Sequence, residues 1–294
     1  MELVDLTVII LTQNEENNLP KAVESVRHIA KRIVIVDSYS TDNTGDIARN
    51  FGCDVYRNKF TNHAEQFNWG LDNCGIETEW VLRLDADEQV TPDLRNELER
   101  ILPDLADAIS GLSIRRRMYF MGRWMKHGGV YPNLVLRIFR YNKGRCEEKI
   151  MDEHIVVDGQ AYEIPFDIID DNTKSLTWWT NKHNWYSDRE CYEVLNLERL
   201  KSEGKLLNPS LFGGFTEKKR WLKENVYLKL PLGSRAWAYY IYRYYIKLGF
   251  LDGPEGRIFH FLQAYWYRFL VDAKIYEARK ADGCTIDRIS KPLE

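Results

Sequence analysis

A chain of 294 residues that is 44% hydrophobic and 29% charged, with a net charge of −3, can bury a large core as one domain plus an appendage. Its five cysteines are odd in number and never form a CxxC pair, which argues against a disulfide framework and a zinc site and fits a reducing cytoplasm. The N-terminus lacks a basic leader, and no stretch reaches the roughly 20 apolar residues of a membrane-spanning helix, so neither a signal peptide nor a membrane span is expected.

The first hundred residues alternate short apolar runs with segments of helical character, which is typical of a parallel sheet built from βαβ units. Strands are predicted at residues 7–12, 32–37, 53–56 and 80–84. Helices are predicted from the Asn17–Pro20 cap to Arg27 and at residues 46–51, 63–74 and 92–102. The predicted fold class is therefore α/β, with a Rossmann-like, mostly parallel central sheet and flanking helices.

The pattern is less regular beyond Gly111. Strands are predicted at residues 112–116 and 134–139, and aromatic and aliphatic residues recur at helical spacing over residues 181–202. These segments complete a main domain predicted to span residues 1–205, followed by a C-terminal amphipathic helical region at residues 206–294.

The C-terminal region is dense in Trp, Tyr and Phe, and it is basic. Residues 205–280 contain 14 Lys and Arg against 6 Asp and Glu, an excess of +8 that leaves −11 for the rest of the chain. Two amphipathic helices are predicted on either side of a turn at residues 249–254. The first would carry a basic stripe of Arg235, Tyr239, Arg243 and Lys247 and an apolar stripe of Trp237, Ile241, Tyr244 and Leu248.

Helices of this kind suit the membrane–water interface, with cations on anionic headgroups and aromatic rings at headgroup depth. The alternative is that the helices pack as a lid or form a homo-oligomer interface. The two interpretations are compatible if Trp237 and Ile241 are buried while Arg235 and Arg243 face lipid headgroups, and this orientation is the one predicted. Nucleic acid is not expected as a partner, because the acidic remainder of the chain would repel phosphate.

Carboxylates follow the fourth predicted strand directly, in the run Leu84-Asp85-Ala86-Asp87. Ligands of open parallel sheets bind beyond the carboxyl ends of the strands, and alternation points Asp85 and Asp87 the same way. The pair suits Mg²⁺ or Mn²⁺, which would take phosphate oxygens as further ligands. The alternative is a set of solvated acids or a cap for the helix at Pro92.

Polar residues also follow the first two strands. Thr12 to Glu15 follow the first strand, and Asp37 ends the second. A carboxylate such as Asp37 can accept a hydrogen bond from the imide N–H of a pyrimidine base, and Thr12 can add further contacts. The alternative is that these residues form helix caps and turns. Neither G-x-G-x-x-G nor G-x-x-x-x-G-K-[ST] occurs, which argues against a dinucleotide site and a P-loop.

Three segments in this order, TVIILTQNEE at 7–16, IVDSYSTDNT at 35–44 and LDADE at 84–88, resemble family 2 glycosyltransferases of the GT-A fold. The likeness is to bacterial enzymes of lipopolysaccharide-core and exopolysaccharide assembly. It extends to the tail, where KLGFLDG at 247–253 and QAYWY at 263–267 are similar to that subgroup.

The resemblance implies an inverting transfer, in which a glutamate before a hydrophobic segment and a glycine takes the acceptor proton. Glu153 stands there, although Asp152 replaces the histidine usual before it, which leaves Asp152 as an alternative base. Asp85 and Asp87 would hold the metal ion, and Asp87 is also assigned to catalysis. The residues expected to bind the donor are Thr12, Asn14, Glu15, Asp37, Gln66, Asn68, Asp85 and Arg137.

The function this implies is transfer of a hexose from a nucleotide diphosphate sugar, such as a UDP-sugar, to a glycan or lipid-linked glycan. The enzyme would act peripherally at the cytoplasmic face of a bacterial membrane, in the synthesis of lipopolysaccharide or another cell-surface polysaccharide. Two alternatives are a nucleotidyltransferase, which generally has a Gly-rich loop after its first strand, and a non-catalytic membrane-associated scaffold. The presence of Asp37, Asp85, Asp87 and Glu153 argues against the scaffold.

Overall fold

The computed structural model describes residues 3–147, 154–196, 221 and 225–280. They belong to two compact units. The first holds the described residues of Met1–Lys126, Val130–Glu148 and Asp152–Thr173, and the second holds those of His127–Gly129 and Lys174–Glu294. The domain boundary predicted at residue 205 lies outside the described residues and stays a prediction.

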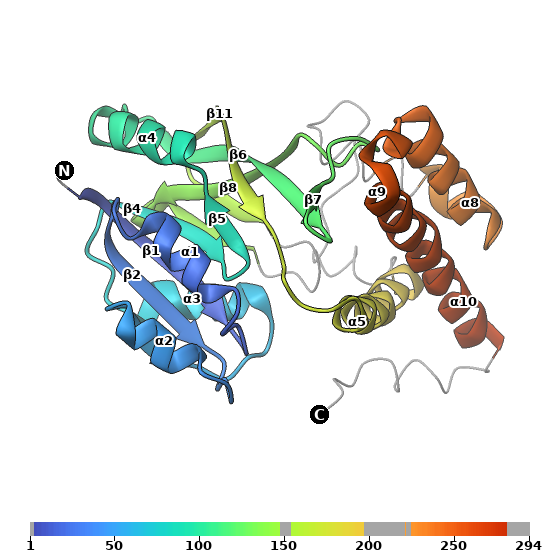
Figure 1. Cartoon of the computed structure of the whole chain (residues 1–294), viewed down its shortest axis with the longest axis horizontal. Helices are drawn as coiled ribbons and strands as arrows, with labels where there is room; N and C mark the ends of the chain where they lie inside the picture. Colours follow the sequence, from blue (N-terminus) through green and yellow to red (C-terminus); the bar gives the residue numbers. More distant parts are fainter. Residues whose placement is uncertain (1–2, 148–153, 197–220, 222–224, 281–294) are drawn as a thin grey trace. The chain divides into compact units, whose positions relative to one another are not determined.

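The first unit is built on one large sheet, whose strands follow the order β3-β2-β1-β4-β8-β6-β11-β5, with β7 paired to β6 (Figure 1). The strands are β1 (Val4–Thr12), β2 (Ala30–Asp37), β3 (Asp54–Arg57), β4 (Trp80–Asp85), β5 (Glu88–Val90), β6 (Ile109–Phe120), β7 (Arg123–Trp124), β8 (Asn133–Arg140) and β11 (Gln160–Asp170). The four strands at the β3 end of this order are parallel, and β8 joins β4 antiparallel. A second, two-stranded sheet pairs β9 (Gly144–Cys146) with β10 (Ile155–Val157).

Helices cover both faces of the parallel strands. Alternation along β1 sends Val8 and Ile10 into one core and Ile9 into another. The first core includes residues of α1 (Leu19–Val26), α2 (Thr44–Asn50) and α4 (Pro92–Ile101), and the second includes residues of α3 (His63–Asn73). Side chains of Asn62 and Thr91 cap α3 and α4 by accepting hydrogen bonds from the backbone N–H of Glu65 and Leu94.

The predicted α/β fold class is confirmed, but several strands of the first unit were not predicted, β11 and β5 among them. β11 brings Ile164 and Ile168 into the core, although Pro165 and charged neighbours obscure its alternation. Residues 88–90, for which no strand was predicted, form β5, which pairs with the end of β11. Both strands are stabilised by pairing with residues distant in the sequence, which local patterns do not report.

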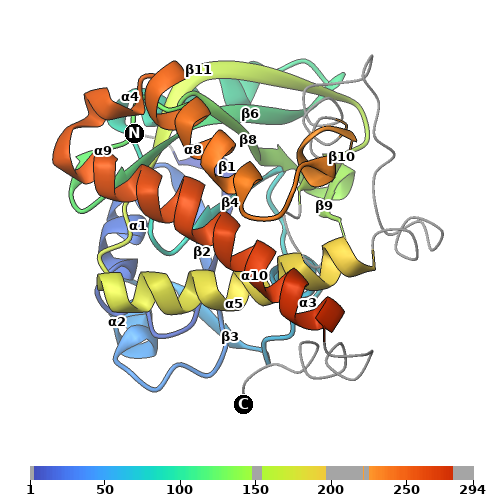
Figure 2. The same cartoon turned by 90° about the vertical axis from the view of Figure 1, so that its right-hand side faces the viewer.

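The second unit is helical (Figure 2). Its elements are α5 (Leu176–Leu195), η3 (Tyr227–Lys229), α8 (Ser234–Ile241), η4 (Tyr242–Ile246), η5 (Gly249–Asp252), α9 (Gly253–His260), η6 (Phe261–Trp266) and α10 (Tyr267–Lys280). Cys191 of α5 packs with Tyr267, Val271 and Ile275 of α10. Within the part of the chain that the structure describes, no helix combines the length and the apolar character needed to cross a bilayer.

The start of α5 differs from the predicted helix at residues 181–202. α5 begins at Leu176, because the side chain of Ser175 caps it by accepting a hydrogen bond from the N–H of Trp178 at 3.2 Å. The predicted C-terminal end at Ser202 lies among residues that the structure does not describe.

The predicted orientation of the first C-terminal helix is wrong. Arg235 and Arg243 are only 2% and 8% exposed, whereas Trp237 and Ile241 are 50% and 47% exposed. The arginines are buried because Asp272 and Gln263 accept their hydrogen bonds inside the helical unit. The apolar stripe is therefore the solvent-facing one.

Candidate functional site

The ends of three adjacent strands bring the predicted polar residues to one edge of the sheet. Thr12, the last residue of β1, pairs with Asp37, the last residue of β2. On the other side of β1, Leu11 pairs with Asp85, the last residue of β4. Parallel strands that stop at the same level place their next residues side by side, as expected for a ligand site of an open α/β sheet.

Asp37 is 2% exposed and is held by three hydrogen bonds. Its Oδ1 accepts from the hydroxyls of Thr12 at 2.9 Å and Ser40 at 2.5 Å, and its Oδ2 accepts from the backbone N–H of Ser40 at 2.9 Å. These bonds fix the orientation of the carboxylate. They also show that Thr12 acts here as a support for Asp37.

The loop after β1 is tied to the loop after β2. Asn14 adopts a left-handed backbone conformation with φ of 56°, and its side-chain carbonyl accepts from the N–H of Thr41 at 2.9 Å. The N–H of Glu15 donates to the hydroxyl of Thr44 at 2.8 Å, and the Glu15 carboxylate accepts from Asn18 at 2.8 Å. The two loops therefore form one rigid wall beside Asp37.

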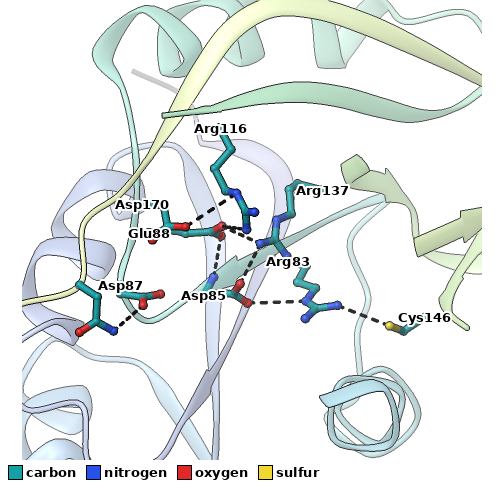
Figure 3. A network of polar contacts seen from close by, with 9 residues as sticks. Arg83, Asp85, Asp87, Glu88, Arg116, Arg137, Cys146 and Asp170 are labelled. Carbon is teal, nitrogen blue, oxygen red and sulfur yellow. Dashed lines mark hydrogen bonds and ion pairs between the residues drawn. The ribbon is translucent and has the colours of Figure 1, made fainter. Parts of the chain in front are cut away.

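Asp85 lies between two arginines (Figure 3). Arg137 of β8 donates to its Oδ2 at 2.7 Å, and Nε of Arg83 is 3.6 Å from its Oδ1. Burial alone would raise the pKa of Asp85, but the guanidinium groups of Arg137 and Arg83 outweigh it and hold this pKa well below its usual range. Asp85 is therefore a carboxylate at any physiological pH.

Two further acids extend this cluster. Glu88 is 1% exposed, accepts from Arg137 at 2.6 Å and accepts from the N–H of Asp85 at 3.0 Å. Arg116 lies between Glu88 and Asp170, with its Nε 3.7 Å from Asp170 (Figure 3). Burial raises the pKa of Glu88 despite the opposing charge of Arg137. Burial and then the charge of Asp87 raise the pKa of Asp170 to about 7.

Asp87 stands apart from the arginines. Its Oδ2 accepts from the side-chain amide of Asn172 at 2.7 Å, and its backbone carbonyl accepts from the N–H of Asp171 at 3.0 Å. The chain after β11 therefore holds the chain after β4. Unlike Asp85, Asp87 makes no described ion pair with an arginine, so it is the better placed of the two to bind a cation.

The predicted donor residues Gln66 and Asn68 of α3 make internal contacts. Gln66 is 1% exposed, donates to Ser38 at 3.0 Å and accepts from Asn58 at 2.8 Å. Asn68 uses both groups of its amide on the backbone of Cys146, at 2.8 and 3.0 Å. Gln66 thereby supports the segment after Asp37, and Asn68 anchors β9. The predicted bases Glu153 and Asp152 lie outside the described residues.

The residues at the sheet edge fit a divalent cation whose other ligands are mostly water molecules and phosphate oxygens. In the described ranges no group of three or more His, Cys, Asp or Glu could hold a metal ion by itself. Mg²⁺ is commonly bound through one or two carboxylates plus the substrate's phosphates, so Asp87 with Asp85 beside it meets this need. The neighbouring arginines limit how far Asp85 can turn toward a cation.

The sequence pattern did not single out Glu88, Asp170, Arg83 and Arg116. A signal was present for Asp170, because Ile168-Ile-Asp-Asp171 repeats the pattern of an apolar run that ends in acids. Arg83 is a charged residue inside an otherwise apolar strand and is 6% exposed, which is itself a sign of a paired group.

We expect Asp170→Asn to raise the free energy of unfolding at pH 8 by about 2 kcal/mol. A carboxyl whose folded pKa is raised binds its proton more tightly in the folded state, so wild-type stability falls as pH rises from about 4 through about 7. Urea unfolding between pH 4 and 8 measures this slope, which the variant should flatten. Glu163→Gln, in the same strand but 49% exposed at its side chain, should change little. An unchanged slope in Asp170→Asn would contradict the assignment.

Known proteins are similar to this chain in sequence. The model of the family described as glycosyl transferase family 2 matches residues 7–160. An uncharacterized glycosyltransferase of Rickettsia typhi is 25% identical over 282 residues, which are 92% of this chain and 87% of that protein. The lipopolysaccharide core biosynthesis glycosyltransferase LpsC of Rhizobium meliloti is 32% identical over 162 residues, which are 53% of this chain and 58% of LpsC.

A solved structure shares the fold. The mannosyltransferase PcManGT of Pyrobaculum calidifontis, in complex with GDP-Man and Mn²⁺, aligns with 94% of this chain and 88% of its own, with a TM-score of 0.51 and 14% sequence identity. The family model covers more than half of the chain, and the fold is that of GT-A glycosyltransferases. This protein belongs to glycosyl transferase family 2.

Proposed function

We propose that this glycosyltransferase is an inverting hexosyltransferase that takes its sugar from a nucleotide diphosphate donor, a UDP-sugar. The observation that carries the proposal is the register of β2, β1 and β4, which puts Asp37 and Asp85 on either side of the end of β1. A nucleotide lying across these strand ends would place its base near Asp37 and its diphosphate near Asp85 and Asp87.

The donor end of the site is preorganised by its hydrogen bonds. Asp37 already has its Oδ1 filled by two hydroxyls, so its Oδ2, which takes one backbone N–H, is the atom we assign to the base. Uracil offers an imide N–H of the required type. Guanine can also donate to a carboxylate, so a GDP-sugar is the second donor to test.

The diphosphate end needs positive charge, and Asp87, with Asp85 beside it, would attract Mg²⁺ or Mn²⁺ there. Such an ion would stabilise the charge that develops on the leaving nucleotide diphosphate. Arg137 and Arg83 keep Asp85 ionised and in place, and Asn172 orients Asp87. The structure of PcManGT, which was solved with GDP-Man and Mn²⁺, supports the assignment of a divalent cation.

The acceptor side requires a base for the attacking hydroxyl, and we assign it to Glu153. A carboxylate in position to take the proton as the bond to the anomeric carbon forms contributes typically about 10²- to 10⁴-fold. The segment 151–159 supports this assignment through its resemblance to the motif of the subgroup.

We further propose that the acceptor is a glycan or lipid-linked glycan of lipopolysaccharide or another cell-surface polysaccharide. The similarity to LpsC, named for lipopolysaccharide core biosynthesis, supports it. Membership in a glycosyltransferase family weighs against a nucleotidyltransferase. The paired and oriented acids at the strand ends weigh against a scaffold without activity, which would have no reason to keep them.

Incubation with Mn²⁺ and a panel of UDP- and GDP-sugars, with slow release of nucleotide diphosphate as the readout, tests the proposal. We expect one UDP-hexose to be hydrolysed and EDTA to stop the release. Glu153→Gln should lower transfer to an acceptor at least about 100-fold. Release from no sugar nucleotide, or release that is indifferent to EDTA, would refute the donor and metal assignments respectively.

A further inference from the structure

The helix formed by α8 and η4 is turned opposite to the usual surface helix. Its arginines, Arg235 and Arg243, are 2% and 8% exposed, whereas Trp237, Ile241 and Ile246 are 50%, 47% and 66% exposed. A helix on the surface of a protein in water normally buries its apolar stripe and exposes its charges. In this helix the arginines are buried and the apolar side chains are exposed.

Specific partners hold the arginines inside. Arg235 donates from Nε to Asp272 at 2.7 Å, and the other carboxylate oxygen of Asp272 accepts from the N–H of Gly233 at 2.7 Å. Arg243 donates to the carbonyl of Gly128 and to the side chain of Gln263, both at 2.7 Å. Buried charges need such partners, so rotating the helix to hide its apolar stripe would break all of these bonds.

The exposed apolar stripe continues onto the elements that follow. Tyr245, Ile246, Leu251 and Phe261 are 57%, 66%, 49% and 44% exposed. Trp237 and Phe261 are linked through the ring of Tyr265, with centroid distances of 4.4 and 5.4 Å. We call this surface, with Trp237, Ile241, Tyr245, Ile246, Leu251 and Phe261 as its members, the aromatic face.

The exposed charges around the aromatic face are positive. Residues 234–251 contain no Asp or Glu, and Lys247 and Arg257 are exposed. The nearest acid in the sequence, Asp252, is 2% exposed because it accepts from the N–H of His127 at 2.9 Å and bonds its ring at 2.6 Å. The face therefore combines exposed aromatic and aliphatic groups with exposed cations, while Asp252 is buried and Glu255 is half-buried.

We propose that the aromatic face inserts into the interfacial layer of a lipid bilayer, with Lys247 and Arg257 at the level of the headgroups. Trp and Tyr favour that layer, and aliphatic side chains such as Ile246 and Leu251 favour the acyl region beneath it. The inference rests on the proposed function to the extent that a lipid-linked acceptor requires the enzyme at a membrane.

A second copy of the chain fits the aromatic face less well than a lipid bilayer does. Two-fold pairing of the aromatic face would place the exposed cations Lys247 and Arg257 of both copies at one interface, without exposed acids in residues 234–251 to pair with them. A bilayer supplies both an apolar interior and, where it carries anionic lipids, the opposite charge.

The mode of attachment follows from which groups are exposed. Since Arg235 and Arg243 are buried, insertion of apolar side chains contributes more than attraction to anionic lipid. Binding should therefore occur on neutral bilayers and persist at high salt, where electrostatic attraction is screened. This reverses the expectation from the basic stripe of the sequence.

The test is sedimentation of the whole protein with vesicles of phosphatidylcholine, with and without phosphatidylglycerol, at low salt and at about 0.5 M NaCl. The variant Ile246→Glu/Leu251→Glu places charge in the aromatic face. Tyr162→Glu, in β11 of the first unit and 53% exposed, is the matched control. All substituted side chains are exposed, so each variant should keep its circular dichroism spectrum and melting temperature.

We expect wild type and Tyr162→Glu to bind both kinds of vesicle and to retain most of this binding at high salt. The double variant should bind at least about fivefold more weakly. Brominated lipid should quench Trp fluorescence less in Trp237→Phe than in wild type. The proposal would be overturned if the protein bound only anionic vesicles and high salt removed that binding. It would also be overturned if wild type bound no lipid but formed a dimer that is lost in the double variant. The double variant should still hydrolyse the sugar nucleotide at the wild-type rate. A failure of the membrane proposal can therefore be distinguished from a failure of the proposed reaction.

Discussion

Asp87→Ala is expected to lower the rate of glycosyl transfer about a thousand-fold, which corresponds to about 4 kcal/mol of transition-state stabilisation. The reason is that Asp87, just after β4, makes no described ion pair with an arginine, so the cation proposed to bind the diphosphate would depend on it. The direct measurement is Mn²⁺ affinity by calorimetry in the presence of UDP, alongside the transfer rate.

Asp93→Ala is the control for this prediction. Asp93 is an exposed acid in the first turn of α4, eight residues after Asp85, and its loss should leave both the transfer rate and Mn²⁺ affinity within about twofold. The stability cost of Asp87→Ala should be small, because it removes one hydrogen bond, from Asn172, at a partly exposed site. Transfer by Asp87→Ala at a near wild-type rate would remove Asp87 from the mechanism.

Arg137→Met is expected to lower the free energy of unfolding by about 3 to 5 kcal/mol. Arg137 is 6% exposed and donates to Asp85 at 2.7 Å and to Glu88 at 2.6 Å. Its removal leaves Glu88 as a buried charge without its nearest counter-ion. Urea unfolding at pH 8 and pH 5 measures the loss, which should be smaller at pH 5 because a protonated Glu88 no longer needs the arginine.

Two comparisons isolate the buried pair. Arg145→Met breaks two 2.8 Å hydrogen bonds to Asp72 at the surface, where both side chains are more than half exposed, and should cost less than about 1 kcal/mol. Adding Glu88→Gln to Arg137→Met should restore part of the stability, because the uncompensated charge is gone. A loss in Arg137→Met no larger than in Arg145→Met would show that the buried network contributes little.

The network explains how acids can be concentrated at one sheet edge. Asp85, Glu88 and Asp170 would repel one another if left alone, and Arg83, Arg116 and Arg137 compensate most of that charge. Asp87 lies beyond the arginines, so negative charge accumulates where a cation would bind. The different roles proposed for Asp85 and Asp87 thus follow from which of the two the arginines contact.

Sequence patterns located the parallel half of the sheet well. The predicted strands at 7–12, 32–37 and 80–84 correspond to β1, β2 and β4, each within three residues at either end. The central residues of these strands are buried and rich in Val, Ile and Leu, which is a strong local signal even with Arg83 inside β4. β11 was missed because its alternation contains Pro165 and is completed by pairing with β6 and β5.

By itself, the sequence determined that β1, β2 and β4 end in Thr12, Asp37 and Asp85, because apolar runs and the polar residues that stop them are local features. The tertiary structure alone decided which arginine pairs with which acid, since Arg137 and Asp85 are 52 residues apart. It also decided which face of α8 is exposed. Both stripes of that helix satisfy the helical period, and only the position of Asp272, 37 residues from Arg235, turns the arginines inward and leaves the aromatic face outside.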